Sequence, residues 1–244
     1  MLIKNRRYSA LNVYAISKNQ FQNAKKDHIE DVPKCLMKRS DDSGYKPKYS
    51  RGRNGAGIFF ALGGILTLLA TTTAEEVVSG FSVKYQAIST LGGAGYPTML
   101  YWDSFILLSG ILWVIGTNFL FRNIGSHLLS LCFYLIGIGL ILVSLNPWNV
   151  NSFLHTIGAL CVAIFGAIAA IRSPRLMGGH IRHTSTFLGI LSLFALIGDQ
   201  WISLVLGPGG AERLIYYPIF FWAILFGGVL IGKNSLAVPS SPIP

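Results

Sequence analysis

Charged side chains are scarce in this chain. Asp, Glu, Lys and Arg make up 12% of its 244 residues, whereas an average soluble domain carries about 25%. Hydrophobic residues make up 52%, and the mean hydropathy is +0.52. This composition excludes an ordinary water-soluble enzyme and indicates a membrane protein.

Cysteine is also rare, which limits the covalent and metal chemistry that can be expected. Cys35, Cys132 and Cys161 are odd in number, and their spacings match no metal-binding or redox motif. We therefore expect neither a disulfide framework nor a zinc site. No metal and no cofactor are predicted.

The positive charge is concentrated at the N-terminus. Residues 1–55 contain 13 Lys and Arg against five Asp and Glu, whereas residues 56–244 contain seven against five. We interpret residues 1–55 as a disordered, basic cytoplasmic tail, since they lack the apolar core of a signal peptide. The tail could attract anionic lipid headgroups or simply enforce topology, and it does not require a nucleic-acid partner. Met37 would serve as a start as well as Met1.

Long apolar runs fill the rest of the chain. A transmembrane helix needs roughly 20 mainly apolar residues. An open sheet is excluded in hydrocarbon because its edge amides would be unsatisfied, and a barrel would need an alternation that these runs lack. We predict an all-α fold, a six-span transmembrane bundle over residues 56–233 with a short cytoplasmic tail at 234–244. The spans are predicted at about 56–74, 102–121, 126–145, 152–171, 184–206 and 214–232.

The Lys and Arg residues between the spans predict the orientation. With both termini in the cytoplasm, 18 basic residues lie inside, and only Lys84 and Arg213 lie outside. Basic residues are retained on the cytoplasmic side of a membrane. The expected localisation is therefore the cell membrane, with several spans, cytoplasmic termini and the lipid bilayer as the principal partner.

In this orientation, polar residues gather at the outer end of the bundle. The outer loop of residues 75–101 is longer than a simple connection needs, and it contains Ser89 within a glycine-rich segment that could bind an anion or form a re-entrant turn. Asp103 could cap a helix, and His155 could be a hydrogen-bonded interfacial residue. The candidate ligand-binding residues are Asp199, Arg213, Glu212, His155, Asp103 and Ser89.

Asp199 is predicted to lie within the membrane. In a span at 184–206 it is about seven residues from the outer end, or roughly 10 Å deep. A carboxylate at that depth needs a partner or a wet interior. Arg213 lies just across a short turn, so we expect an ion pair between Asp199 and Arg213.

Three kinds of function remain open on the sequence alone. The leading hypothesis is binding or passage of a small polar, ionic or lipid-headgroup ligand at the outer pocket. A lipid hydrolase is the first alternative, although His127, His180 and His183 fall on the inner side, no GxSxG is present, and no catalytic residue can be assigned. A structural or assembly protein is the second alternative. The sequence does not predict an oligomeric state.

Several short motifs resemble those of a known family. They are Ser89 to Gly92 in the outer loop, Gly110 in the second span, Glu212–Arg213 at the start of the last span, and Tyr217–Pro218 within it. In these motifs the chain resembles the domain of unknown function 998 family of prokaryotic, notably archaeal, membrane proteins, over residues 56–233. Thr90 stands where many members carry an acid, which argues against a metal or proton role for the loop. The resemblance implies a helical membrane fold and no particular activity.

The orientation can be tested by thiol labelling. Single cysteines placed within residues 75–101 should react with a membrane-impermeant thiol reagent added to intact cells, because that loop is predicted to lie outside. Cysteines placed in the N-terminal tail should react only after the cells are opened. Labelling of the tail in intact cells would contradict the orientation.

Overall fold

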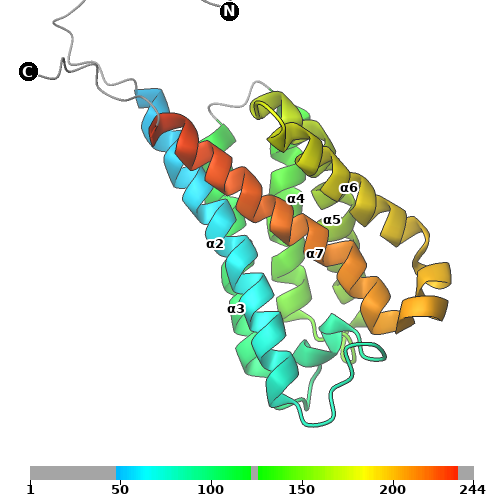
Figure 1. Ribbon diagram of the computed structural model, residues 1–244. Helices are drawn as coiled ribbons and strands as arrows, with labels where there is room; N and C mark the ends of the chain where they lie inside the picture. The colour runs from blue at the N-terminus through cyan, green and yellow to red at the C-terminus, as the bar shows by residue number, and fades with distance from the viewer. Residues whose placement is uncertain (1–47, 122–125, 236–244) are drawn as a thin grey trace, which may run out of the picture. The chain divides into compact units, whose positions relative to one another are not determined.

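The computed structural model describes residues 48–121 and 126–235, and all regular structure in these ranges is helical (Figure 1). This confirms the predicted all-α fold. Of the predicted tails, residues 1–47 and 236–244 lie outside the described residues, as does Arg122. The helices are α2 (Lys48–Val77), α3 (Met99–Phe121), α4 (His127–Leu145), α5 (Ser152–Arg172), α6 (Ile181–Ile197) and α7 (Asp199–Ser235), with the 3-10 turns η1 (Ile88–Gly92) and η2 (Ser173–Leu176).

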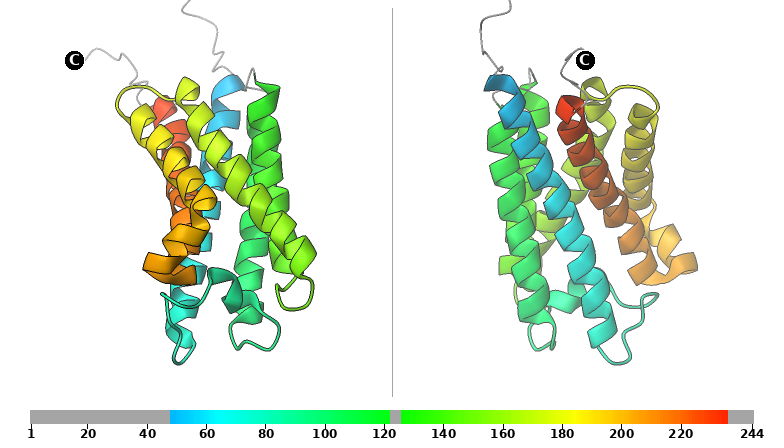
Figure 2. Two further views of the ribbon diagram at one scale, coloured as in Figure 1. Left: turned by 90° about the vertical axis from the view of Figure 1, so that its right-hand side faces the viewer. Right: turned by 60° about the vertical axis from the view of Figure 1, so that its left-hand side comes forward.

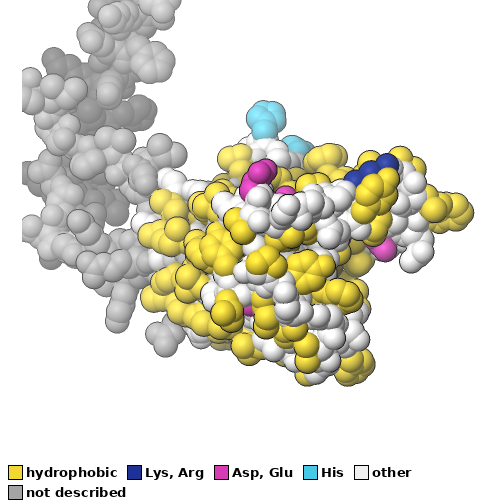
Figure 3. All heavy atoms as spheres, turned by 90° about the horizontal axis from the view of Figure 1, so that it is seen from below, with side chains coloured by type: hydrophobic (Ala, Val, Ile, Leu, Met, Phe, Trp, Pro, Cys, Tyr) yellow, Lys and Arg dark blue, Asp and Glu magenta, His cyan; other side chains and the backbone are white. Residues whose placement is uncertain are grey.

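Five of these helical segments are long and apolar enough to cross a membrane, so the chain is a multi-pass membrane protein. Large hydrophobic side chains also cover outward-facing surfaces; Phe187, for example, is 61% exposed and Phe194 is 65% exposed. Outward-facing hydrophobic side chains along the helices suit hydrocarbon and not water. Figure 3 shows the described part of the molecule from one end of the bundle, where hydrophobic side chains lie among other side chains and a few charged ones. The spans begin and end at Asn54–Val77, Met99–Phe121, His127–Leu145, Ser152–Leu176 and Asp199–Gly232.

The predicted boundaries differ from the structure at two places. α2 begins at Lys48, within the predicted tail. The predicted fifth span, 184–206, is divided, since α6 ends at Ile197, Gly198 leaves the helical conformation, and α7 begins at Asp199. α6 has 17 residues, or about 26 Å of helix, slightly less than the roughly 30 Å hydrocarbon layer. Hydropathy missed this turn because the average over residues 184–206 stays apolar despite Asp199 and Gln200.

The helices form a closed arrangement in which each packs against the next along the chain. α2 also packs against α7, which brings the first and last described helices together. The start of α2 and the end of α7 lie at the same end of the bundle, and the connection between α2 and α3 lies at the other end (Figures 1 and 2). It comprises residues 78–98, and we refer to it as the 78–98 connection.

An aromatic cluster fills the bundle core between α2, α3, α4 and α7. The centroids of the Phe60 and Phe133 rings lie 5.0 Å apart, and those of Trp113 and Trp222 lie 6.1 Å apart. Phe226 stacks on Trp222 with centroids 5.5 Å apart. All five side chains are fully buried. Rings in such contact contribute packing energy beyond their buried area.

Close helix contacts are made at glycines. A Cβ added at Gly57 in α2 would lie 2.6 Å from the carbonyl oxygen of Gly227 in α7, and one added at Gly139 in α4 would lie 2.6 Å from that of Gly158 in α5. The contact at Gly158 brings the backbones of α4 and α5 together. Small residues let helix backbones approach in a membrane, where apolar burial alone drives association weakly.

Two adjacent glycines of α7 provide a matched test of this packing. Gly227→Ala should lower the thermal stability, because its methyl group would overlap the backbone of Gly57 and Ala61, and overpacking costs roughly 1–3 kcal/mol. Gly228→Ala should leave stability unchanged or raise it, because nothing lies within 4 Å of its added Cβ. Thermal unfolding in detergent checks both variants. Equal effects would contradict the close contact between α2 and α7.

Candidate functional site

The 78–98 connection folds back against the bundle. Ile88 and Leu91 of η1 are buried, and the Thr98 hydroxyl donates to the Leu91 carbonyl oxygen at 2.9 Å. The Asn149 side chain, in the connection between α4 and α5, donates to the Ala94 carbonyl at 2.9 Å and accepts from the Ala94 N–H at 2.8 Å. The connection therefore forms part of the bundle's packed interior at this end.

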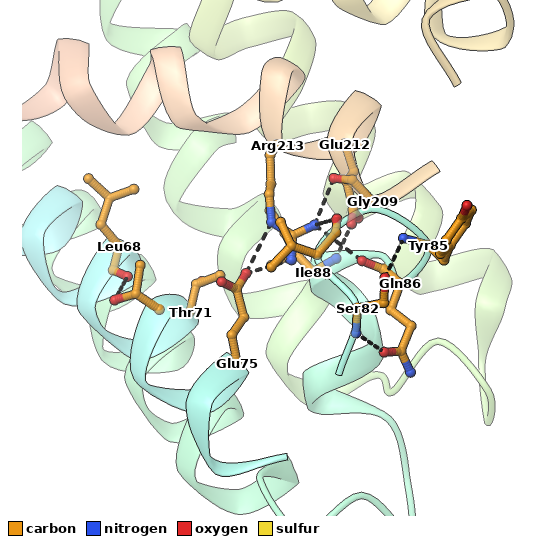
Figure 4. A network of polar contacts seen from close by, with 12 residues as sticks. Leu68, Thr71, Glu75, Ser82, Tyr85, Gln86, Ile88, Gly209, Glu212 and Arg213 are labelled. Atoms are coloured by element: carbon orange, nitrogen blue, oxygen red, sulfur yellow. Dashed lines mark hydrogen bonds and ion pairs between the residues drawn. The ribbon is translucent and has the colours of Figure 1, made fainter. Parts of the chain in front are cut away.

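Arg213 of α7 joins three parts of the chain (Figure 4). Its Nε and Nη2 donate to Glu75 Oε1 at the end of α2, at 3.1 and 2.5 Å. Its Nη1 donates to the carbonyl oxygens of Val83 and Gln86 at 3.0 and 3.1 Å and to that of Gly209 at 2.7 Å. The residue is only 8% exposed. We call Glu75, Arg213 and the carbonyls that Arg213 binds the arginine clamp.

A break in α7 makes room for the connection. Gly207 has φ 80° and ψ 162°, in the left-handed half of the map that favours glycine, and Pro208 begins the helix that follows. Gly209 donates its N–H to the Lys84 carbonyl at 3.0 Å. A side chain at Gly209 would overlap the carbonyls of Val83 and Gln86. The glycines of this turn therefore allow the backbone of the connection to reach Arg213.

Asp199 is not the partner of Arg213, which corrects the sequence-based expectation. Arg213 forms its ion pair with Glu75. Asp199 lies in the first turn of α7, beyond the end of α6, and not two turns inside a span. An acid suits that place because the N-terminal end of a helix dipole is positive. Asp199 lies outside α6 because that helix ends earlier than hydropathy suggested.

Glu212 also binds the 78–98 connection, but it accepts a hydrogen bond where Arg213 donates. Its Oε2 accepts a hydrogen bond from the Ile88 N–H, and its carboxylate lines the same pocket as Ser89. Arg213 thus binds carbonyl oxygens just before η1, while Glu212 binds the first N–H of η1. Two consecutive residues of α7 fix the position of this short segment.

A small pocket with a cavity volume of about 50 Å³ lies beside this segment, between α2, α3, α4, α5, α7 and η1. One part of its wall is polar and the remainder is apolar, so it is suited to a molecule with both kinds of surface. The polar lining residues are Thr67, Thr71, Ser89, His155, Glu212 and Tyr216. The other lining residues are Ile88, Trp102, Ile106, Leu140, Val143, Ala159, Val162 and Phe220.

His155 and Trp102 are held in the pocket wall by hydrogen bonds. His155 is 7% exposed, and its Nδ1 lies 2.8 Å from the Asn146 carbonyl oxygen. Because a carbonyl can only accept, Nδ1 carries the proton. The Trp102 Nε1 donates to the Thr71 hydroxyl at 3.2 Å. His155 thus has the predicted interfacial hydrogen bond and also lines the pocket.

The structure brings together part of the predicted site. Ser89, His155 and Glu212 line one pocket, whereas Arg213 is committed to the arginine clamp and Asp199 is not a lining residue. Asp103 follows Trp102 in the second turn of α3, so it is not a helix cap. Its Oδ1 is buried against Gly92 and has no hydrogen-bond partner within the described part of the chain.

Sequence reasoning missed three kinds of contributor. Glu75 could have been found, since it is an acid at the end of an apolar run and so needs a partner by the argument applied to Asp199. Trp102 and Tyr216 gave no signal, because aromatic residues are common near membrane interfaces. Thr67 and Thr71 gave no signal either, because hydroxyls in a span commonly bond to their own helix. Thr67 does so, donating to the Gly63 carbonyl at 3.0 Å.

Two arrangements that a hydrolase could use are absent from the described residues. Within ranges 48–121 and 126–235, no three or more His, Cys, Asp or Glu side chains could together hold a metal ion. A triad of Ser89, His155 and Asp199 is not assembled, because Asp199 does not line the pocket that holds the other two.

No protein-family model, curated protein or solved structure matches this chain. The resemblance to the domain of unknown function 998 family stays a prediction, and the functional argument rests on the geometry of the site.

The arginine clamp predicts strong coupling between Glu75 and Arg213. Glu75→Gln and Arg213→Gln should each lower the stability by about 3 kcal/mol, since removing one partner leaves the other buried and unpaired. The double variant should lose less than the sum of the two. Thermal unfolding in detergent, with melting shifts of several degrees, measures the cycle.

Asp199→Asn is the control for this cycle. Its effect should be small and should add to that of Arg213→Gln, because the two side chains are not paired in the structure. Additivity between Glu75 and Arg213, or coupling between Asp199 and Arg213, would contradict the clamp.

Proposed function

We propose that this protein binds a small amphiphilic ligand in the pocket beside η1, as a receptor or as part of a path across the membrane. The observation that carries the proposal is the pocket itself. It is lined by five helices and η1, and its largely apolar wall carries a few polar groups. Concave sites with this mixed lining are typical of small-molecule binding.

The position of the polar lining supports this proposal. Thr67, His155, Glu212 and Tyr216 all belong to the apolar segments that are long enough to span a membrane. Polar and ionisable groups are costly there, and they commonly mark substrate or ion pathways. A purely structural bundle could fill the same space with apolar side chains at lower cost.

We further propose that the pocket faces the outside of the cell membrane. The last residue of α5 is Arg172, and Arg175 and Arg182 follow it in the chain. This end of α5 lies at the end of the bundle where α2 starts and α7 finishes (Figure 1). By the positive-inside tendency, that end is cytoplasmic. The 78–98 connection and the pocket beside it then lie in the outer half of the membrane, and both termini are cytoplasmic.

Filling the pocket should abolish binding. Ala159 lines the pocket, whereas its neighbour Leu160 is 41% exposed on the outer surface of α5. With 1-decanol as a neutral amphiphilic probe, wild type and Leu160→Phe in phosphatidylcholine nanodiscs should show a saturable rise in melting temperature. Ala159→Phe should show none, because the added ring occupies the pocket. Equal shifts in all three proteins would mean that the probe acts on the bilayer, and would contradict the proposal.

A further inference from the structure

The charges around the pocket define its ligand more narrowly. We propose that the ligand is a single-chain organic cation, with its ammonium group beside the Glu212 carboxylate and the aromatic wall. This inference rests on the proposed function, because it assigns a chemical class to the same pocket.

The pocket lining contains an acid but neither Lys nor Arg. Glu212 is a lining residue, and no Lys or Arg is found among the described residues that line the pocket. Arg213, the neighbouring base, already donates to Glu75 and to three carbonyl oxygens. A ligand therefore meets the carboxylate and not the guanidinium.

Glu212 retains capacity to accept another hydrogen bond. Its Oε2 accepts a hydrogen bond from the Ile88 N–H. A carboxylate offers about four lone-pair sites, so there is room for a further donor. An ammonium supplies donors together with the opposite charge, and charge-assisted hydrogen bonds are the stronger kind.

Aromatic residues continue from Glu212 along the same face of α7. Tyr216 and Phe220 follow at intervals of four residues, and both line the pocket, as does Trp102 from α3. Residues spaced by four lie above one another on a helix. The faces of Trp, Tyr and Phe attract cations, most strongly where water is excluded. The acid and the rings therefore favour the same charge on a ligand.

The remaining lining distinguishes between sources of such a cation. Ile106, Leu140 and Val162 provide an apolar region for a hydrocarbon chain. A phospholipid headgroup with an amine also carries a phosphate, which is commonly recognised by Arg or Lys. Because the pocket lining offers neither, a single-chain amine without a phosphate fits better than a phospholipid headgroup.

Matched probes test this assignment on the wild-type protein. Decylammonium, 1-decanol and decanoate share one chain length and differ in charge, and lysophosphatidylethanolamine places the same ammonium beside a phosphate. Binding is measured by melting-temperature titration in phosphatidylcholine nanodiscs, with Ala159→Phe subtracted as the bilayer background. Decylammonium should bind roughly tenfold more tightly than 1-decanol, which corresponds to one charge-assisted hydrogen bond. Decanoate and lysophosphatidylethanolamine should bind more weakly than decylammonium.

The outcomes separate this inference from the proposed function. If decylammonium and 1-decanol bind with equal affinity, or if decanoate or lysophosphatidylethanolamine binds more tightly than decylammonium, the pocket is a ligand site but the cation assignment is overturned. If none of the four probes binds above the Ala159→Phe background, the proposed function fails as well.

A charge-neutral variant then tests the role of Glu212. Glu212→Gln keeps a carbonyl oxygen that can accept from the Ile88 N–H but removes the charge. It should lose the preference for decylammonium while 1-decanol binding remains. Glu76→Gln, which removes an exposed acid next to Glu75, should keep the preference. Retention of the preference in Glu212→Gln would overturn the assignment, and the wild-type ranking decides it if that variant does not fold.

Discussion

The buried ion pair between Arg213 and Glu75 is the constraint on which this end of the molecule depends. A guanidinium at the end of an apolar bundle is tolerated only when it is paired and hydrogen-bonded. The chain meets that requirement with residues far apart in sequence: a carboxylate at the end of α2 and carbonyls from the 78–98 connection and from α7. Satisfying one side chain therefore positions three segments, and the connection is fixed in the wall of the pocket.

The clamp also determines the electrostatics of the pocket. Glu212 and Arg213 are consecutive, and they bind the same connection through different groups, the first N–H of η1 and the carbonyls that precede it. The guanidinium donates to the groups of the clamp, whereas the carboxylate lines the pocket. Of these two adjacent, oppositely charged side chains, only the Glu212 carboxylate is therefore left to face a ligand. The aromatic residues that follow Glu212 on α7 extend that surface toward an apolar region.

The sequence predicted the helices well because apolar length is a strong signal for a membrane span. It placed Ser89, His155 and Glu212 at one end of the bundle, where the structure also has them, since an even number of crossings separates these segments. It failed at Asp199, because the average hydropathy across the turn at Gly198 stays high despite Asp199 and Gln200. It also paired Arg213 with a near neighbour, whereas the true partner is 138 residues away. Pairing over that distance depends on α2 packing against α7, which hydropathy does not reveal.

If the arginine clamp holds the 78–98 connection in the pocket wall, removing the charge of Glu75 should loosen that connection. Hydrogen–deuterium exchange of wild type and Glu75→Gln in nanodiscs, with Glu76→Gln as the charge-matched control, measures this. The amides at residues 83–92 should exchange faster in Glu75→Gln, because their anchor is weakened, while the amides of α4 and α5 keep their wild-type protection. Unchanged exchange at 83–92, or an equal increase throughout the bundle, would contradict this role of the clamp.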